Sequence, residues 1–461
     1  MASPESQPLS VLPESREAAS LLTRKYIRKI TVSSETAYAL LARTLQGVMM
    51  LAAGAAVVCC LSLDQQGYFF SFMSFGALLQ MGDFGLCYAV LNNANHLSAI
   101  GQGSRLAGLF SRAIRLNCGT SLLFAVAVGL TGFQIFSAGR NASELTRLVW
   151  FYPWISFVCA LFLAQLTAPG ISFIEGGISV VAAWRFRFLQ ELLSGPVLIL
   201  LFSYGFGLWS LVLFWLSRFV VSATWLWMTK PHLGAATAFT WREWHTEVWP
   251  FQWKMGLSAL SGFLVFQAIN PIVLAEQGLK AAGQFGFSLA IMNMVLMVTT
   301  VWPISKAAHY ANLLSTRQFQ KLRHSFREVT ILSTLFAFCS ALGISMILWW
   351  LTYIRLPYVD RLADWFTTTA LLAAGVLHHI VCCFAVLLRA ERREPLLWVS
   401  VIGGTLTLPV LWIPAHFGKP QTIAATNLCC TFAGLLLVYF IYRRRVALWK
   451  TGIELSVESC P

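Results

Sequence analysis

The stretch LDQQGYFFSFMSFGALLQMGDFGLCYAVLNNANH (Leu63–His96) decides the fold class of this chain. From Tyr68 to the polar end at His96 it exceeds the roughly 20 apolar residues needed to cross a bilayer, so we expect one long transmembrane helix. Between Tyr68 and His96, Asp83 is the only formally charged residue. A carboxylate inside a span is costly unless it faces a cavity or a partner, which makes Asp83 a candidate functional residue. The alternative is a capped or protonated carboxyl group that only packs.

The composition indicates a polytopic membrane protein. Hydrophobic residues make up 57% of the 461-residue chain and charged residues only 11%, and the mean hydropathy is +0.68. Soluble domains carry roughly 25% charged residues. We therefore predict an all-α fold of about twelve transmembrane helices in two six-helix lobes around a central cavity. The apolar windows lie near residues 40–62, 68–95, 114–136, 148–172, 188–205, 208–228, 255–275, 284–308, 328–351, 366–389, 395–416 and 422–442.

The distribution of Lys and Arg predicts the orientation of these spans. Most of the 33 basic residues lie in the two tails and in the loops that follow even-numbered spans, and Arg218 lies inside a span. Because basic loops stay in the cytoplasm, both termini are predicted to be cytoplasmic. The net charge of +14 then reflects topology, and we expect no nucleic-acid partner. The loops on the other side contain only Arg140, Arg147, Lys280, Arg355, Arg361 and Lys419.

A tryptophan-rich segment divides the chain into two halves. It contains WREWHTEVWPFQWK and is expected to lie as an amphipathic linker at the cytoplasmic interface. The predicted parts are a polar tail without a signal-peptide core (1–36), an N-lobe (37–228), the linker (229–254), a C-lobe (255–442) and a second cytoplasmic tail (443–461). The first span is expected to act as its own insertion signal.

The two halves share an order of helices that suggests an internal repeat. Sliding the sequence on itself so that Gly67 lies on Gly283 also places Phe69 on Phe285, Met81 on Met297 and Leu106 on Leu322. These identities are few, so the shared helix order carries the argument. Duplicated halves with a binding site between them are a transporter architecture.

Arg218 is the most informative basic residue, because an arginine near the middle of a span must face the protein interior. Its planar guanidinium suits a diphosphate or carboxylate ligand, and the alternative is a structural ion pair with Asp83 or Glu191. Arg43, near the start of the first span, is a second candidate for the cavity, although it can also snorkel to the surface. Further polar candidates are Gln267, Asn270 and Asn293, each of which can instead form a hydrogen bond between helices.

Trp184, Arg185 and Arg187 follow the fourth span and are predicted to form part of a cytoplasmic entrance; the alternative is that they only determine topology. The sequence contains no Walker lysine motif and no GxSxG motif, so we expect no enzymatic activity. His378 and His379 are adjacent on a helix, where their side chains diverge, and neither has an acidic partner at metal-ligand spacing. No metal site or cofactor is therefore expected.

Several strings resemble the O-antigen and related polysaccharide flippases of the multidrug/oligosaccharidyl-lipid/polysaccharide exporter superfamily. They are QGYFF from Gln66 with DFGL from Asp83, FIEGGISVVAAWRFRFLQ from Phe173, WPFQWKMGLSALSGFLVFQAINPIVLAEQG from Trp249 and AGQFGFSL from Ala282. The resemblance covers most of residues 37–327. The chain departs from it at Asp83, where the family often has Glu, and at Leu97, where an acidic residue is common.

The resemblance implies a flippase that moves a polyprenyl-diphosphate-linked oligosaccharide across the bacterial inner membrane by alternating access. The expected partners are this lipid-linked oligosaccharide, membrane lipids and polysaccharide polymerase or ligase machinery. Coupling to a proton or sodium gradient is left open, with Asp83 as the candidate coupling residue. One alternative is an ion-coupled small-molecule or drug exporter of the same superfamily. A second alternative is an integral-membrane glycan polymerase or acyltransferase, which would need a large external catalytic loop.

Overall fold

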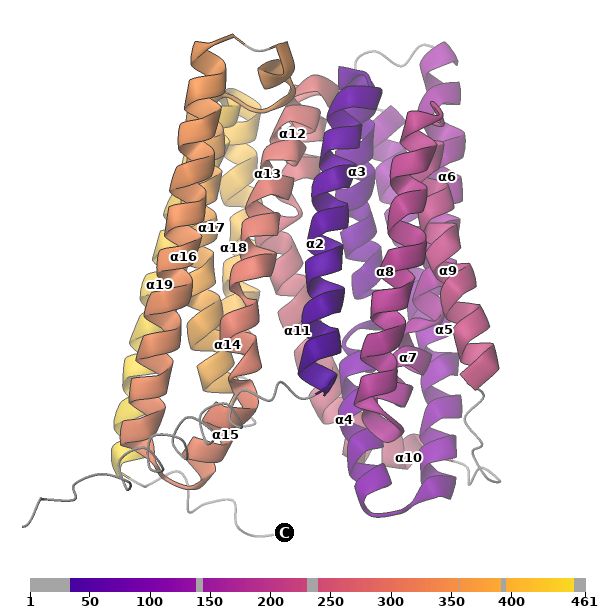
Figure 1. The fold of residues 1–461 in the computed structure, drawn as a ribbon, viewed down its shortest axis with the longest axis vertical. Helices are drawn as coiled ribbons and strands as arrows, with labels where there is room; N and C mark the ends of the chain where they lie inside the picture. Colours follow the sequence, from indigo (N-terminus) through magenta and orange to yellow (C-terminus); the bar gives the residue numbers. More distant parts are fainter. Residues whose placement is uncertain (1–33, 138–143, 230–238, 356, 391–394, 452–461) are drawn as a thin grey trace, which may run out of the picture.

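The computed structural model describes residues 34–137, 144–229, 239–355, 357–390 and 395–451 (Figure 1). Within these ranges every regular element is helical, and twelve helices or series of helices are long and apolar enough to cross a membrane. The prediction of an all-α polytopic fold with about twelve spans is therefore confirmed. Residues 1–33 of the predicted tail and residues 230–238 of the predicted linker lie outside the described residues.

The N-lobe contains the first six spans. The second span begins at a capping box, in which the Ser62 hydroxyl accepts a hydrogen bond from the Gln65 backbone and the Gln65 side chain accepts one from the Ser62 backbone. The elements of this lobe are α2 (Ser34–Cys60), α3 (Leu63–Gln80), η1 (Met81–Asp83), α4 (Leu86–Ala99), α5 (Gly103–Ser137), α6 (Glu144–Leu166), α7 (Ala168–Gly177), α8 (Val180–Ser203) and α9 (Trp209–Thr229).

The linker and the C-lobe follow. The linker contains α10 (Trp241–Glu243) and a π-helical turn, η2 (Trp244–Val248). The last helix continues through residues 443–451, which were predicted to belong to the C-terminal tail. The C-lobe elements are α11 (Trp249–Phe266), α12 (Ile269–Gln277), α13 (Leu279–Thr299), α14 (Val301–Ser305), α15 (Ala307–Ser315), α16 (Phe319–Tyr353), η3 (Pro357–Arg361), α17 (Trp365–Arg389), α18 (Leu397–Phe417) and α19 (Pro420–Thr451).

The single helix expected around Asp83 is instead two helices, α3 and α4, joined by the short helix η1. After Asp83 the backbone enters the left-handed region at Phe84 (φ 45°) and Gly85 (φ 77°), which ends the helical hydrogen-bond series. Gly85 adopts this conformation without strain because it has no Cβ atom. The uninterrupted apolar pattern concealed the break, since it reports burial in the membrane and says nothing of backbone dihedrals.

The eighth span is interrupted at the position that the internal repeat predicts. The alignment that places Gly67 on Gly283 places Phe84 on Thr300, and Thr300 is the residue between α13 and α14. The second and eighth spans therefore start at the same end of the molecule and break at equivalent positions of the repeat. This shared break supports the internal duplication more strongly than the few identical residues do.

We name the two ends of the molecule by their charge. The basic end (lower in Figure 1) contains the starts of α2, α8 and α16 and is the side that the sequence predicts to be cytoplasmic. The opposite end contains the α2–α3 turn and η3. Figure 1 shows the two lobes together near the opposite end, whereas α14 and α15 diverge from α4 and α7 toward the basic end.

The lobes meet at the opposite end through α3 and α13. A Cβ atom at Gly67 would lie 2.3 Å from the Leu279 carbonyl oxygen, and one at Gly283 would lie 2.9 Å from the Gly67 nitrogen. Gln66 Nε2 donates to the carbonyl oxygens of Gly283 (3.1 Å) and Arg361 (2.8 Å). The crossing thus brings backbone against backbone, which only glycine permits at this distance.

An aromatic core fills the N-lobe next to this crossing. Phe72, Phe136 and Trp154 are buried, with ring centroids of Phe72 and Trp154 4.9 Å apart. Trp154 Nε1 donates to the Gly129 carbonyl oxygen, so its polar group has a partner. Large rings packed from α3, α5 and α6 thus fill this half of the N-lobe.

The linker is docked on the N-lobe at the basic end. Phe239, Trp244 and Val248 are buried in an apolar cluster with residues of α4, α5 and α7. Arg105 on α5 forms ion pairs with Glu243 (3.3 Å) and Glu247 (2.8 Å) of the linker. The linker therefore forms a packed part of the N-lobe and does not merely lie along an interface.

Candidate functional site

Two ion pairs lie inside the basic half of the N-lobe. Arg187 Nη2 is 2.6 Å from Glu175 Oε2, and Arg218 Nη1 is 2.7 Å from Glu191 Oε1. Arg187 and Glu191 are one helical turn apart, so the two pairs share one face of α8. We call these four residues together with Arg43 the interior cluster.

Polar neighbours orient the Arg218 guanidinium. Its Nη2 atom donates to Gln190 Oε1 at 3.0 Å, and Gln190 Nε2 donates to the Ser222 hydroxyl at 2.7 Å. Gln190 lies on α8, which begins after Ser179. The Ser179 hydroxyl caps this helix by accepting a hydrogen bond from the Ala182 backbone. The guanidinium is therefore held by acceptors on α8, and its charge is compensated by Glu191.

Trp184 connects the ion pairs to α2. The Arg187 guanidinium carbon lies 4.5 Å from the Trp184 ring centroid, and that of Arg43 lies 5.8 Å from it. Both distances suit cation–π contacts. Arg43 also donates to Gln46 at 3.3 Å. Of the three residues predicted to form an entrance, Arg187 thus belongs to the interior cluster and Trp184 contacts two of its arginines.

The interior cluster has one positive charge in excess, because it contains three arginines and two glutamates. The arginines are also the more accessible members. The side chains of Arg187 and Arg218 are 31% and 19% exposed, whereas those of Glu175 and Glu191 are 12% and 10% exposed. Arg43 is exposed, and no carboxylate lies within ion-pair distance of it among the described residues. An approaching ligand therefore meets guanidinium groups before it meets carboxylates.

Asp83 does not belong to this cluster. Its carboxylate oxygens accept hydrogen bonds from the backbone nitrogens of Gly85 and Cys87, both at 3.2 Å. It therefore caps the first turn of α4, where a negative charge is favourable. Of the two alternatives weighed for Arg218, the pair with Glu191 is present and the pair with Asp83 is not.

The predicted C-lobe residues do not converge with the arginines. Asn270 was expected to line a cavity but is fully buried beneath the α3–α13 crossing, close to Gly286, and its side-chain nitrogen and oxygen have no hydrogen-bond partner there. Gln267 ends α11, and Asn293 is half-buried on α13. The six predicted cavity residues thus lie at separate places, and only Arg43 and Arg218 belong to one group.

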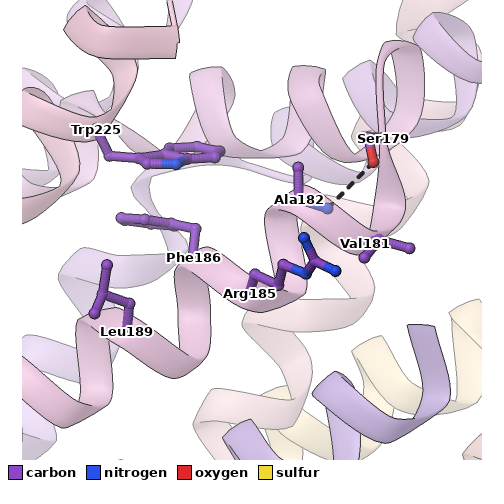
Figure 2. A pocket seen from close by; sticks show the side chains of 7 residues that line it. All are labelled: Ser179, Val181, Ala182, Arg185, Phe186, Leu189 and Trp225. Carbon is purple, nitrogen blue, oxygen red and sulfur yellow. Dashed lines mark hydrogen bonds between the residues drawn. The ribbon is translucent and has the colours of Figure 1, made fainter. Parts of the chain in front are cut away.

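Arg185 lies apart from the interior cluster. It lines a pocket of about 280 Å³ between α8 and α9, and Figure 2 shows its side chain near Ala182, with Phe186, Leu189 and Trp225 farther along. Two sides of the same turn of α8 therefore have different surroundings. Arg187 faces the carboxylate of Glu175, whereas Arg185 faces this pocket.

The histidines of α17 are packed residues. His379 is fully buried and bonded to the Ser333 hydroxyl at 2.9 Å, and His378 Nε2 is 3.3 Å from Cys382 Sγ. No group of three metal-ligating side chains occurs in the part of the chain that the structure describes. This arrangement gives no support to metal chemistry in α17.

Glu175 was not singled out from the sequence, although it holds one of the two ion pairs. A usable signal was present, because Glu175 is the only acidic residue in FIEGGISVVAAWRFRFLQ, a string that also contains two arginines. Its partner could not be inferred. Glu175 and Arg187 lie on two helices, and the turn between them sets their distance.

No protein-family model matches the sequence, and no curated protein matches it. The structure resembles solved structures over nearly its whole length. It matches the inward-facing conformation of a multidrug resistance MATE family transporter of the MOP superfamily with a TM-score of 0.65 and 13% identity, covering 90% of this chain and 99% of that one. For an outward-facing conformation of such a transporter the TM-score is 0.62, with 13% identity and coverage of 91% and 96%.

A third match is the Vibrio cholerae MATE transporter VcmN in its bent form, with a TM-score of 0.57, 14% identity and coverage of 91% of this chain and 99% of that one. At such low identity these likenesses establish the fold alone. They confirm the expected twelve-span, two-lobe fold, and the polysaccharide flippase function stays a prediction. This chain has the twelve-span, two-lobe fold of the MATE family transporters.

Proposed function

We propose that this protein is an alternating-access exporter of small amphipathic molecules and that anions are its preferred substrates. The proposal rests on the fold, which matches both an inward-facing and an outward-facing multidrug transporter of the MOP superfamily. It corrects our preference from the sequence, which placed the lipid-linked oligosaccharide flippase before the small-molecule exporter.

The arrangement of the lobes supports alternating access. They are joined at the opposite end by the Gly67–Gly283 crossing and diverge toward the basic end (Figure 1). A substrate would reach the interior cluster from the basic end. Rocking of the two lobes against each other, around the interior cluster, would then expose the same groups to the other side of the membrane.

The charge of the interior cluster supports the preference for anions. A carrier of cations needs carboxylates that lack a partner, but Glu175 and Glu191 are each paired with an arginine. The excess positive charge and the greater exposure of the guanidinium groups favour a carboxylate, sulfonate or phosphate ligand. Arg43 would make the first contact, since it is exposed and has no carboxylate within ion-pair distance in the described chain.

Everted membrane vesicles test this function directly. Uptake of an anionic, a cationic and a neutral fluorescent dye of similar size is compared under an imposed proton or sodium gradient. The double substitution Glu191→Leu with Arg218→Leu removes a charge pair without leaving either partner buried alone. We expect anion uptake to fall about tenfold in this variant, the loss expected for one charge-assisted hydrogen bond.

Arg115→Leu is the matched control, because Arg115 is exposed on α5 and donates only to the Ser111 carbonyl within its own helix. It should leave uptake unchanged. Preferential uptake of the cationic dye would overturn the anion preference. Absence of gradient-dependent uptake of every dye, with normal protein abundance, would overturn small-molecule export itself.

The interior cluster also favours a second candidate, the flippase for a polyprenyl-diphosphate-linked oligosaccharide. Its three guanidinium groups suit a diphosphate, whose oxygens accept bidentate hydrogen bonds. Reconstituted protein that moves this lipid-linked glycan across liposomes, and takes up none of the dyes, would favour this candidate. The bacterial inner membrane and partnership with a polymerase or ligase belong to this second candidate and stay predictions. The cytoplasmic termini, which were predicted from the basic loops, also stay a prediction.

A further inference from the structure

We propose that the pocket between α8 and α9 binds an anionic phospholipid, with the phosphate on Arg185 and an acyl chain along the apolar wall. We call this pocket the lateral pocket. Its volume is about 280 Å³, and it is lined by residues of the first turns of α8 together with Trp225 of α9 (Figure 2). This site is separate from the interior cluster and goes beyond the proposed transport function.

The lateral pocket lies at the depth of lipid head groups. It is formed where α8 begins, at Val180, and near where α9 ends, at Thr229. Trp227 and Met228 in the last turn of α9 are 67% and 72% exposed. Exposed tryptophan at the end of a spanning helix marks the membrane–water interface. The pocket therefore faces the leaflet at the basic end.

Arg185 supplies an uncompensated charge to this pocket. It is exposed, and its guanidinium carbon lies 4.8 Å from the centroid of the Tyr38 ring. No carboxylate lies within ion-pair distance of Arg185 among the described residues, whereas Arg187, two positions along, is paired with Glu175. A guanidinium at the interface without a carboxylate partner favours a phosphate group, whose oxygens accept its hydrogen bonds bidentately.

The rest of the lateral pocket is apolar. The rings of Phe186 and Trp225 are stacked with centroids 4.2 Å apart, and Leu189 is 44% exposed one turn beyond Arg185. These side chains lead from the charged residue toward the middle of the membrane. A ligand that matches both parts has a phosphate head and a hydrocarbon chain, which a free phosphate ion lacks.

Native mass spectrometry of the full-length protein in detergent tests the proposal. The added probes are phosphatidylglycerol, zwitterionic phosphatidylcholine, and glycerol phosphate as the head group without acyl chains. The test variants are Arg185→Ala, which removes the charge, and Ala182→Leu, which fills the pocket and leaves the charge. The matched control is Arg115→Ala, since Arg115 is another exposed arginine, on α5, and does not line the lateral pocket.

We expect one phosphatidylglycerol to bind the wild type and the Arg115→Ala protein with equal affinity. Arg185→Ala should weaken this binding about tenfold, the loss expected for one charge-assisted hydrogen bond. Ala182→Leu should weaken it by a similar factor, because the larger side chain occupies the space proposed for the acyl chain. Equal weakening by Arg115→Ala would overturn the proposal in favour of general surface charge. Binding of glycerol phosphate as tight as that of the lipid would overturn the role of the acyl chain. Equal binding of phosphatidylcholine would overturn the role of anionic charge.

Discussion

The two ends of the molecule hold the lobes in different ways. At the opposite end α3 and α13 meet backbone to backbone at Gly67 and Gly283, and Arg361 of the C-lobe donates to the Leu61 carbonyl oxygen of the N-lobe. At the basic end the N-lobe instead contacts the linker, through Arg105 and a buried Trp244. One end joins the lobes directly, and the other joins the N-lobe to the segment that leads into α11.

This difference indicates which contacts must break during transport. Opening the opposite end requires the crossing of α3 and α13 to separate, which exposes buried backbone groups. Opening the basic end requires no such separation, because the linker stays with the N-lobe. Between the ends, Gly85 and Gly256 bring the α3–α4 break against α11, since a Cβ atom at Gly85 would lie 2.6 Å from the Gln252 carbonyl oxygen.

The largest effect on the balance between the two conformations is expected from Gly67→Ala. Its Cβ atom would lie 2.3 Å from the Leu279 carbonyl oxygen, so the crossing must move apart. Overpacking typically costs about 1–3 kcal/mol, which corresponds to a shift of about tenfold in the balance between the two conformations. Spin labels are placed on α9 and α16 where each helix reaches the opposite end of the molecule, in a cysteine-free background. Double electron–electron resonance between them reports the change.

Gly119→Ala is the control for this measurement, because no atom lies within 4 Å of the Cβ position at Gly119. It should leave the distance distribution unchanged. If Gly67→Ala also leaves the distribution and the uptake rate at wild-type values, the direct crossing is not the contact that holds the opposite end closed.

A moderate effect is expected at the break beside α11. Asp83→Ala removes the acceptor for the Gly85 and Cys87 backbone nitrogens and should lower the free energy of unfolding by about 1 kcal/mol, the usual loss for a helix cap. Asp83→Asn keeps an acceptor, so stability and uptake should stay close to wild type. Thermal unfolding and vesicle uptake measure the two quantities. Loss of gradient-dependent uptake in a stable Asp83→Asn protein would instead support the coupling role predicted from the sequence.

The smallest effect is expected from Arg105→Gln at the docked linker. Arg105→Gln removes two ion pairs whose side chains are about one-third exposed, and such pairs are screened by solvent and salt. The thermal midpoint should fall slightly at low ionic strength and match wild type at high ionic strength. The comparison variant Trp244→Ala removes a buried ring and should lower the free energy of unfolding by about 3–5 kcal/mol. A larger effect of Arg105→Gln than of Trp244→Ala would show that charge, and not apolar burial, holds the linker.

Apolar windows and basic loops were sufficient to predict twelve spans and two halves. These features are local, since a helix that satisfies its own backbone hydrogen bonds is the form that an apolar segment takes in a bilayer. Arg218 could be assigned to the interior for the same reason, because its charge is too costly to face lipid. The repeat was predicted as well, and the break at Thr300, the residue that the repeat aligns with Phe84, adds structural support to it.

Only the tertiary structure decided which polar groups meet. Arg218 pairs with Glu191 and not with Asp83, because α8 packs beside α9 while the left-handed turn at Phe84 and Gly85 lets Asp83 cap α4. Arg185 and Arg187 look alike in the sequence but point to different sides of α8. Helix packing and backbone breaks fix these directions, and they depend on contacts between residues far apart in the chain. The sequence by itself therefore determined the membrane architecture, whereas the placement of each charge depended on how the helices pack.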